Sequence, residues 1–445
     1  MNDSFDPRSY GAVADGRTKD TAAVQAAIDA AAAQGGTVRL AGGIFVCGTL
    51  YLKSNVALEI TNSATLLASP NIADYGTDTH HNRYRNEPEL DRCFLFAQDA
   101  ENVTICGSGV IDGNAAAFPN AGSIYRPMLL RVLRCRNVRV TGLRLLNAAA
   151  WTTAFLNSDF IWATDLHIEN HRNYNGDGLD LDGCRHVWVR GCYIDGTDDN
   201  LCLQSSGLPV QDVHISDCAF TSVCAGIRIG LKSIGEISGV VISNCTMRNV
   251  WREGIKLECT EGGSITDVLV ENVTMHNVRR PIFAILNNRY RPDDLGSSVE
   301  LDHIPPIGTM SRLRFVGITA VDDEEMAHAQ RRFDNDIMGE PRFGGCRFDA
   351  NAAHPIQDVT IRDFWYTAIG GVRLADLPAA PYPEVPDRLQ DPAACASENY
   401  YPDWSRTTHL DARNVRGLTL ENLHFNTLHP DERPKMLTEG PTVML

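Results

Sequence analysis

Short stretches that alternate apolar and polar residues recur along most of the chain. Each follows a turn-forming residue, as in NVTICGSGVIDG from Asn102, NVRVTGLRLLN from Asn137 and DVHISDCAFTS from Asp212. Period-two alternation in segments rich in Val, Ile and Thr is typical of β-strands. Further copies begin at Asp159, His186, Gly239, Asp267, Arg312, Asp358 and Gly417. The spacing through the middle of the chain is about 22 to 28 residues, which is typical of a solenoid.

This repeat predicts an all-β fold, a right-handed parallel β-helix in which each coil contributes two or three short strands. Successive coils of such a helix stack about 4.8 Å apart, so equivalent positions become direct neighbours. Cys192, Cys218 and Cys245 share one position in the repeat. We therefore expect these thiols to form an inward stack of small side chains.

The N-terminal region has a different pattern. Residues 21–34, TAAVQAAIDAAAAQ, predict a helix that Asp20 and Thr21 can cap and that ends at Gly35 and Gly36. We expect this helix to cover the open end of the solenoid, since an uncovered strand edge invites aggregation.

We expect one β-helix domain over residues 1–445. The cap and first coils occupy residues 1–60, regular coils 100–290, and C-terminal coils with long loops 290–445. The segments 290–311, 323–357 and 370–411 are rich in Pro, Gly and charged residues, which predicts loops along one side of a cleft.

Composition narrows the possible partners. The formal net charge of −16 argues against nucleic acid and anionic membranes as partners. No apolar run is long enough to span a bilayer, and the N-terminus lacks the pattern of a signal peptide, so we expect a cytoplasmic protein. The 13 cysteines show no paired CxxC spacing, and neither a metal nor another cofactor is expected. The oligomeric state is left open.

Two consecutive repeats hold the densest group of carboxylates. The segments NYNGDGLDLDGC and IDGTDDNLCLQSS contain Asp177, Asp180, Asp182, Asp195, Asp198 and Asp199. Asp177 and Asp198 are about one coil apart, which predicts neighbouring rungs. Cleavage of a glycosidic bond needs a carboxylic acid and a second carboxylate, roughly 6.5–9.5 Å apart in inverting enzymes. Crowding also favours protonation of one member, which suits it to act as the acid.

Other uses of these carboxylates stay open. Asp195, like Asp165, Asp212 and Asp217, is expected to cap a turn. Asp198 and Asp199 can face one cleft only if the backbone bends at Gly196 and Thr197, because neighbouring strand residues point to opposite faces. A Ca²⁺ site of the kind found in β-helix lyases would use the same oxygens.

Longer segments resemble a known family. SYGAVADGRTKDTAAVQAAIDAAAAQGGTVRLAGGIF and NGDGLDLDGCRHVWVRGCYIDGTDDNLCLQSS are similar to blocks of the polygalacturonase-type glycoside hydrolases, family 28. The resemblance covers most of residues 5–290. By position it implies inverting hydrolysis with Asp198 as general acid, Asp177 and Asp199 as the residues that hold and activate water, and Asn175 as a residue that shapes the site.

Two blocks depart from the family pattern. CAGIRIG replaces Gly-His-Gly, with Ala225 at the His position, and GIKLE replaces Arg-x-Lys, with Lys256 and Glu258 in that block. Arg228 either joins Lys256 in a positive patch or pairs with Glu258. We count Asn175, Arg228, Lys256 and Glu258 among the substrate-binding residues, together with Tyr290 and Trp151; for Trp151, packing is the alternative.

These features predict a glycoside hydrolase with an inverting mechanism. We expect an exo-acting enzyme whose partner is a pectin-derived oligosaccharide or a small glycoside. A lyase, transferase or epimerase on the same scaffold is one alternative. A non-catalytic carbohydrate-binding β-helix is the other.

Overall fold

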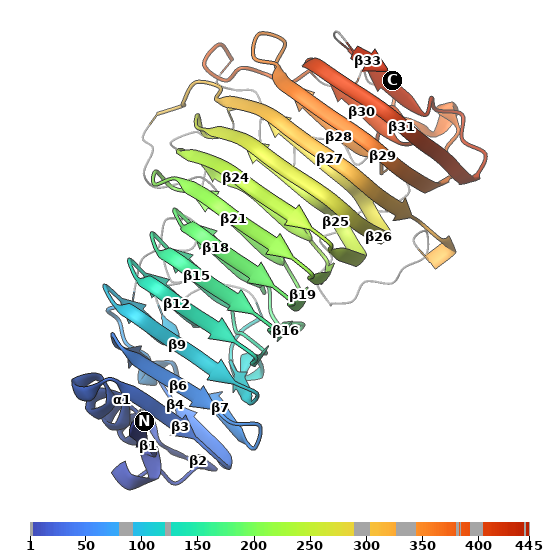
Figure 1. The fold of residues 1–445 in the computed structure, drawn as a ribbon. Coiled ribbons are helices and arrows are strands. Elements are labelled where there is room, and N and C mark those ends of the chain that lie inside the picture. The colour runs from blue at the N-terminus through green and yellow to red at the C-terminus, as the bar shows by residue number, and fades with distance from the viewer. Residues whose placement is uncertain are drawn as a thin grey trace. The chain divides into compact units, whose positions relative to one another are not determined.

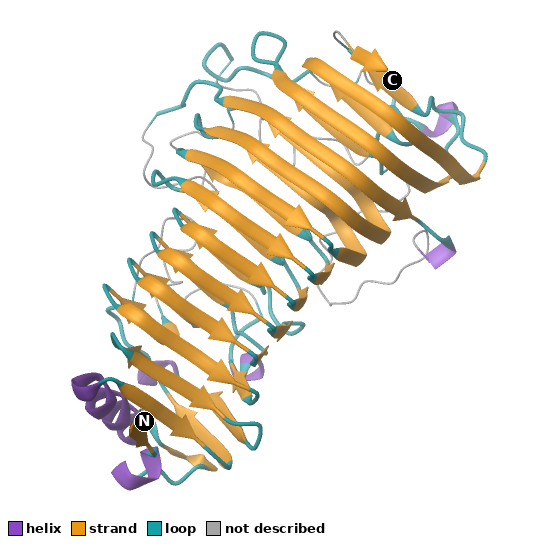
Figure 2. Ribbon diagram, in the orientation of Figure 1, coloured by secondary structure: helices purple, strands orange, loops and turns teal. Residues whose placement is uncertain are grey.

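The computed structural model describes residues 3–79, 92–120, 126–288, 303–325, 344–379, 382, 384–391, 404–439 and 442–444. The strands of each coil pair in parallel with those of the next, and the chain is a parallel β-helix (Figures 1 and 2), which confirms the predicted fold class. Contacts divide the chain into two units, residues 1–198 and 199–445, which are described in turn. The single domain over residues 1–445 stays a prediction. No helix in the described ranges is long and apolar enough to cross a membrane.

The first unit contains three stacks of parallel strands. One stack comprises β3 (Gly36–Leu40), β6 (Val56–Ile60), β9 (Glu101–Gly107), β12 (Arg136–Thr141), β15 (Asp159–Thr164) and β18 (Arg185–Arg190). A second comprises β4 (Gly43–Cys47), β7 (Ala64–Ala68), β10 (Val110–Asp112), β13 (Arg144–Leu146), β16 (His167–Glu169) and β19 (Tyr193–Gly196). The third comprises β5 (Leu50–Leu52), β8 (Cys93–Gln98), β11 (Met128–Leu133), β14 (Thr153–Leu156) and β17 (Leu179–Asp182). At the N-terminal end, β1 (Asp3–Phe5) pairs with β3 and β2 (Asp15–Lys19) pairs with β4.

The predicted N-terminal helix is α1 (Thr21–Gln34), which packs on β1, β3, β5 and β6. It ends where Gly35 adopts a φ of 73°, as the sequence indicated. The predicted capping by the Asp20 side chain was wrong. Its carboxylate accepts hydrogen bonds from the Val13 and Ala14 N–H groups at 2.7 and 3.0 Å, so it fastens the preceding loop instead.

The second unit continues the same architecture with longer strands. One stack comprises β21 (Val210–Ser216), β24 (Glu236–Ser243), β26 (Ser264–Leu286), β27 (Thr309–Val321), β29 (Ile356–Gly370), β31 (Val415–His429) and β33 (Thr442–Met444). The other comprises β20 (Leu201–Ser205), β23 (Ile227–Ser233), β25 (Thr246–Cys259), the end of β26, β28 (Cys346–Ala350), β30 (Leu410–Arg413) and β32 (Met436–Thr438). The short strand β22 (Ala219–Ser222) pairs with β25. Strand β28, the starts of β27 and β30 and both ends of β29 lie in segments predicted as loops, so that prediction was wrong there.

A left-handed turn residue marks each repeat. Nine of the ten sequence copies begin at a residue with φ between 54° and 74°, at positions 102, 137, 186, 212, 239, 267, 312, 358 and 417. In the copy from Asp159 the left-handed residue is Phe160, one position later. Asn, Asp and Gly tolerate this conformation better than other residues, which explains their recurrence. The asparagines also form a ladder, since Asn137 Nδ2 donates to Asn102 Oδ1 at 2.6 Å and Asn102 Nδ2 to Asn55 Oδ1 at 2.7 Å.

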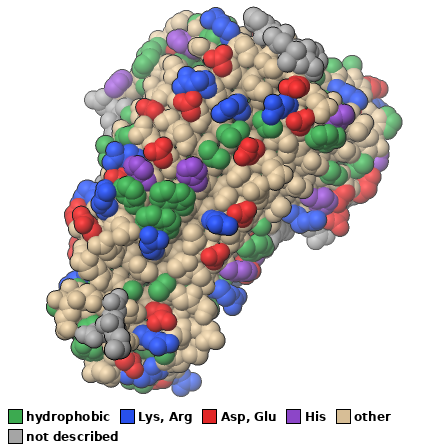
Figure 3. Space-filling model, viewed as in Figure 1, with side chains coloured by type: hydrophobic (Ala, Val, Ile, Leu, Met, Phe, Trp, Pro, Cys, Tyr) green, Lys and Arg blue, Asp and Glu red, His purple; other side chains and the backbone are tan. Residues whose placement is uncertain are grey.

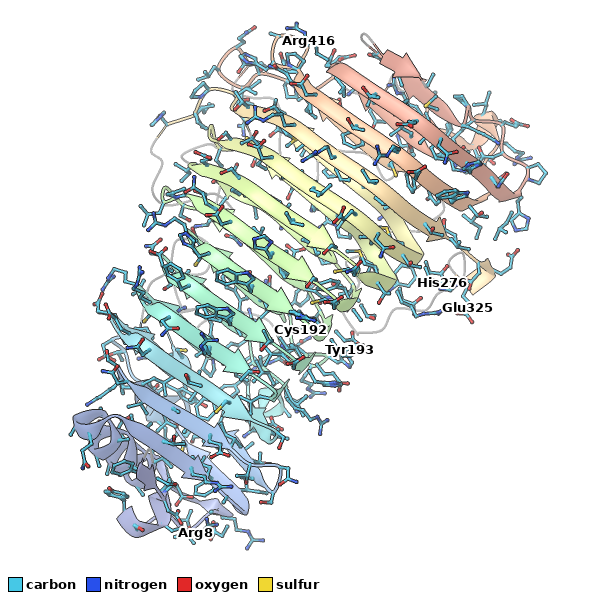
Figure 4. All side chains as sticks on the ribbon, viewed as in Figure 1. Arg8, Cys192, Tyr193, His276, Glu325 and Arg416 are labelled. Carbon is cyan, nitrogen blue, oxygen red and sulfur yellow. The ribbon has the colours of Figure 1, made fainter. Side chains whose placement is uncertain are left out.

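Strand alternation places the cysteines inside. Cys192 is 2% exposed and its neighbour Tyr193, labelled with it in Figure 4, is 37% exposed. In the second unit Cys218 and Cys245 are buried. Hydrogen bonding to Cys218 and burial raise the pKa of the Cys245 thiol, which keeps the group protonated and suits it to packing.

Candidate active site

The loop between β16 and β17 carries the first part of the candidate site. Arg126, which is 2% exposed, donates to the Tyr174 carbonyl oxygen at 2.5 Å and to Asn175 Oδ1 at 2.9 Å. Asn175 itself has a φ of 53°, a left-handed conformation that Asn tolerates. The Asn175 side chain therefore helps to fix the loop that leads into Asp177.

Thr197 joins this loop to the turn that carries Asp198. Its hydroxyl donates to the Asn173 carbonyl oxygen at 2.5 Å and accepts from the Gly176 N–H at 3.0 Å. Gly176 precedes Asp177 and Thr197 precedes Asp198, so one hydroxyl holds the two carboxylate-bearing backbones together. The chain bends at Thr197 and Asp198, directly after β19. Asp177 is buried and Asp198 is half-buried.

Asp199 opens the second unit and is held as an anion. Its Oδ2 accepts from Arg228 Nη1 at 2.8 Å and its Oδ1 from the Ala225 N–H at 3.2 Å. Burial opposes ionisation of this carboxyl group, but the charges of Arg228 and Lys256 outweigh burial and lower its pKa. Asp199 is therefore held in its ionised form.

Arg228 pairs with a second acid through its other edge. Arg228 Nε donates to Glu258 Oε2 at 2.6 Å, and the Glu258 side chain is 1% exposed. Strand register places Arg228 beside Lys256 and Gly230 beside Glu258. Because Gly230 has no side chain, the guanidinium can reach diagonally to Glu258. A Cβ at Gly230 would lie 2.0 Å from the Glu258 carbonyl oxygen, so the position requires glycine.

A third acid extends the network behind Lys256. Lys256 Nζ lies 3.6 Å from Glu258 Oε2 and 3.5 Å from Glu253 Oε2, and Arg280 Nη1 lies 3.1 Å from Glu253 Oε1. Burial would raise the pKa of Glu253, but Lys256 and the nearby arginines lower it to about 2. Burial and the charges of Arg279 and Arg347 lower the pKa of Arg280 to about 9. The buried charges thus compensate one another along the stack.

The remaining predicted site residues have different surroundings. Lys256 and Glu258 are fully buried, so they lie behind Arg228 rather than at an open surface. Trp151 is half-buried and packs against an apolar cluster that includes Phe96 and Met128. Tyr290 lies outside the described residues.

Sequence reasoning missed Arg126, the roles of Thr197 and Gly230, and Glu253. Glu253 stands three residues before Lys256, and residues at that spacing point to opposite faces of a regular strand, so it carried no local signal. Arg126 carried none, because its contacts lie 48 and 49 residues further along the chain.

Among the described residues, Asp199 and Cys224 of the second unit belong to a group with possible metal-ligand atoms. Atoms of Asp199 and of the Cys224 thiol lie within 4.8 Å of each other. Both Asp199 oxygens already accept hydrogen bonds, one of them from the positively charged Arg228. A cation at this carboxylate would face that charge, so these two residues suit a proton-transfer site better than a metal site.

Beyond Glu258 the outward row of side chains is covered. On the next coil Phe283 lies beside Lys256 and Ile285 beside Glu258. Val385 packs against both Phe283 and Ile285. We call Tyr382 and residues 384–391 the end segment.

Asn288 fastens the end segment. It donates to Asp387 Oδ1 at 2.8 Å and accepts from the Arg388 N–H at 2.9 Å. On the following coils Arg347 and Arg413 lie 5.0 and 4.9 Å from the centre of the Tyr382 ring. The end segment thus covers this coil, where Phe283 and Ile285 are buried.

The family model described as glycosyl hydrolases family 28 matches residues 48–300. The chain belongs to glycosyl hydrolases family 28. Among curated relatives, a "Probable polygalacturonase" of Vitis vinifera is 26% identical over 262 residues, which are 52% of this chain and 52% of that protein. An "Exo-poly-alpha-D-galacturonosidase" of Dickeya chrysanthemi is 26% identical over 243 residues, which are 43% of this chain and 40% of that protein. The chain thus spans about half the length, or less, of these curated relatives.

Two solved structures share the fold of this family 28 chain. An exopolygalacturonase from Thermotoga maritima matches with a TM-score of 0.70 at 19% identity, covering 96% of this chain and 92% of that one. A family 28 exopolygalacturonase of Yersinia enterocolitica matches with a TM-score of 0.69 at 17% identity, covering 100% and 78%. At this level of identity the likeness concerns the fold.

Proposed function

We propose that this family 28 protein is a glycoside hydrolase that cleaves pectin-type oligosaccharides with inversion. The observation that carries the proposal is the surroundings of Asp199, a buried carboxylate that Arg228 holds as an anion directly after the half-buried Asp198. The names of two curated relatives, "Probable polygalacturonase" and "Exo-poly-alpha-D-galacturonosidase", support the choice of substrate class.

In the proposed reaction Asp198 is the protonated acid. It donates its proton to the glycosidic oxygen while the bond from that oxygen to the anomeric carbon breaks. Asp177 and Asp199 hold a water molecule on the opposite face of the sugar. One of these carboxylates takes a proton as the water oxygen bonds to the anomeric carbon, so the configuration inverts.

Arg228 supports this division of roles. Its positive charge favours the ionised form of Asp199, so Asp199 is ready to accept a proton at neutral pH. Lys256 and Glu258 are buried, and we assign them to positioning Arg228 rather than to touching the sugar. Asn175, anchored by Arg126, shapes the loop beside Asp177.

The end segment supports exo action. A polymer that is cut internally needs an open groove along several coils, and here Val385 covers Phe283 and Ile285 on the coil after Glu258. We infer that a chain end stops at this cover and that the enzyme releases short products. Polygalacturonate cleavage would then release sugar ends with little loss of viscosity, whereas a rapid fall in viscosity at low sugar release would contradict exo action.

The test of the proposed chemistry is Asp198→Asn on a panel of pectin oligosaccharides, followed by NMR of fresh products. We expect an inverted product anomer from the unchanged protein. Loss of the acid should slow turnover by about 10²–10⁴-fold while binding persists. Asp165→Asn, at an exposed turn carboxylate, is the matched control.

Three outcomes would contradict the proposal. Unchanged turnover of Asp198→Asn would remove the acid role. A retained anomer would remove the inverting mechanism. An unsaturated product that absorbs in the near ultraviolet would indicate a lyase.

A further inference from the structure

A polar hollow of about 450 Å³ lies on the outer side of the second unit, away from the stack that carries Arg228 and Glu258. It is lined from β27, β29 and β31 by Arg314, Thr360 and Thr419, which are direct neighbours in the parallel ladder. Arg314 is exposed, and the flanking Leu313 and Phe315 are buried. Figure 3 shows basic and acidic side chains interspersed over strands β24 to β31 on this side.

The hollow results from a local change in side-chain size. The row of turn residues beside it contains Asp267, Arg312, Asp358 and Gly417. Gly417 has a φ of 74°, and a Cβ there would lie 2.9 Å from Asp358 Oδ1. The space beside β31 therefore stays open between the Asp358 carboxylate and the small Thr419 side chain.

The two arginines that line the hollow differ in their contacts, because in the part of the chain that the structure describes Arg312 is in an ion pair and Arg314 is not. Arg312 Nε and Nη2 donate to the two oxygens of Asp267 at 2.7 and 2.8 Å, so these two groups neutralise each other. Within the described residues Arg314 has neither a hydrogen bond nor an ion pair, although its charge contributes to lowering the pKa of Asp267. An exposed guanidinium is thus available beside two hydroxyl groups and the Asp358 carboxylate.

This set of groups fits an acidic sugar. A guanidinium binds a carboxylate through two parallel hydrogen bonds. A carboxylate such as that of Asp358, and threonine hydroxyls, can bond the ring hydroxyls of a pyranose. Arg314 and Thr419 are two coil steps apart, about 10 Å at the usual strand spacing, which is room for more than one sugar ring.

We propose that this hollow is a second glycan-binding site, which holds a uronate unit of a pectin-type chain through Arg314 and Asp358. The choice of sugar rests on the proposed function. The site takes part in no bond cleavage, since the groups of this unit that the proposed reaction uses lie elsewhere, Asp199 in the turn before β20 and Arg228 on β23. It would hold polymeric substrate on the protein surface while short products leave.

The test is affinity electrophoresis of the full chain in gels that contain polygalacturonate, with neutral galactan in a parallel gel. The background is Asp198→Asn, so that the polymer survives the run. Arg314→Ala should weaken retention about tenfold, since it removes one charge-assisted contact. Arg248→Ala removes an equal charge from an exposed position outside the hollow and is the control.

Retention by polygalacturonate that falls with Arg314→Ala and not with Arg248→Ala supports the site. Equal retention of the two variants overturns it, as does equal retention in neutral galactan. Hydrolysis of short oligogalacturonates by Arg314→Ala in the active chain should be unchanged. If retention depends on Arg314 but the chain with Asp198 intact hydrolyses no oligogalacturonate, the binding site is supported and the proposed function is contradicted.

Discussion

Replacing Arg228 tests the buried charge network most directly. Arg228→Met keeps most of the side-chain volume and removes the guanidinium that bridges Asp199 and Glu258. Removing one partner from a buried ion pair typically costs about 3–5 kcal/mol, because the other charge is left without compensation. Lys256 lies 3.6 Å from Glu258 and compensates in part, so we expect about 3 kcal/mol at neutral pH.

The pH dependence of this loss has a definite sign. The pKa of Asp199 is lowered in the folded protein, so its contribution to stability is present above its ordinary value of 3.8 and is lost as the pH falls below it. The difference between the unchanged protein and Arg228→Met should therefore be largest near neutral pH and should shrink in acid. Urea unfolding followed by far-ultraviolet circular dichroism at several pH values measures it.

A double variant separates the structural role of Arg228 from its role at Asp199. Arg228→Met with Glu258→Gln removes the uncompensated acid and should regain part of the lost stability. Activity should not return, because Asp199 still lacks its cation, and the acidic limb of the pH–rate profile should move to higher pH. Glu258→Gln alone serves as the control, since it leaves the contact between Arg228 and Asp199 in place.

Two results would refute this reasoning. Equal stability of Arg228→Met and the unchanged protein at neutral pH would mean that the network contributes nothing. A double variant with restored activity would mean that Asp199 does not depend on Arg228.

Three further changes test other parts of the molecule. Asp322 is buried, and burial raises its pKa to about 7, so its contribution to stability is lost as the pH rises from 3.8 through that value. In urea unfolding, Asp322→Asn should therefore raise the free energy of unfolding by up to about 4 kcal/mol at pH 8 and by little near pH 4. A gain in stability that is largest in acid would contradict this expectation. Asn137→Ala loses the ladder hydrogen bond and strains a left-handed residue, which should lower the free energy of unfolding by about 2 kcal/mol. Asn137→Gly should lower it by less, because glycine adopts the left-handed conformation without strain. Thermal midpoints of both variants equal to that of the unchanged protein would show that the ladder adds no stability. Thr197→Ala removes two hydrogen bonds between the loops of Asp177 and Asp198 and should lower both the thermal midpoint and kcat, while Thr197→Ser should keep both.

Much of the coil architecture could be read from local signals. Alternation gives the strand faces, and a left-handed turn favours Asn, Asp or Gly at the start of each repeat. Asn102, Asn137 and Asp212 show this rule, because their φ values depend on local sterics rather than on distant partners. Strand β28 escaped detection, since the single run CRFDA is too short for periodicity to separate it from a loop.

The sequence predicted the acidic residues of the site but not the residues that hold them in place. Asp177, Asp198 and Asp199 stand out because two Gly-rich turns carry them one repeat apart. The partner of Arg228 could be named from sequence only as one of two alternatives, because the choice depends on Gly230 leaving a diagonal path to Glu258. Glu258 lies on the next coil, in β25, two positions beyond the residue that pairs directly with Arg228, so no local pattern in the sequence indicates this contact.

The sequence by itself therefore determined the repeat, the strand faces, the turn conformations and the candidate acids, since each depends on neighbours a few positions apart. Only the tertiary structure decided that Arg228 holds Asp199 and Glu258 together and that Val385 packs on Phe283 and Ile285 of the next coil. Those contacts join residues dozens of positions apart. Parallel stacking of the strands sets the contact with Glu258, and the path of the end segment sets that of Val385.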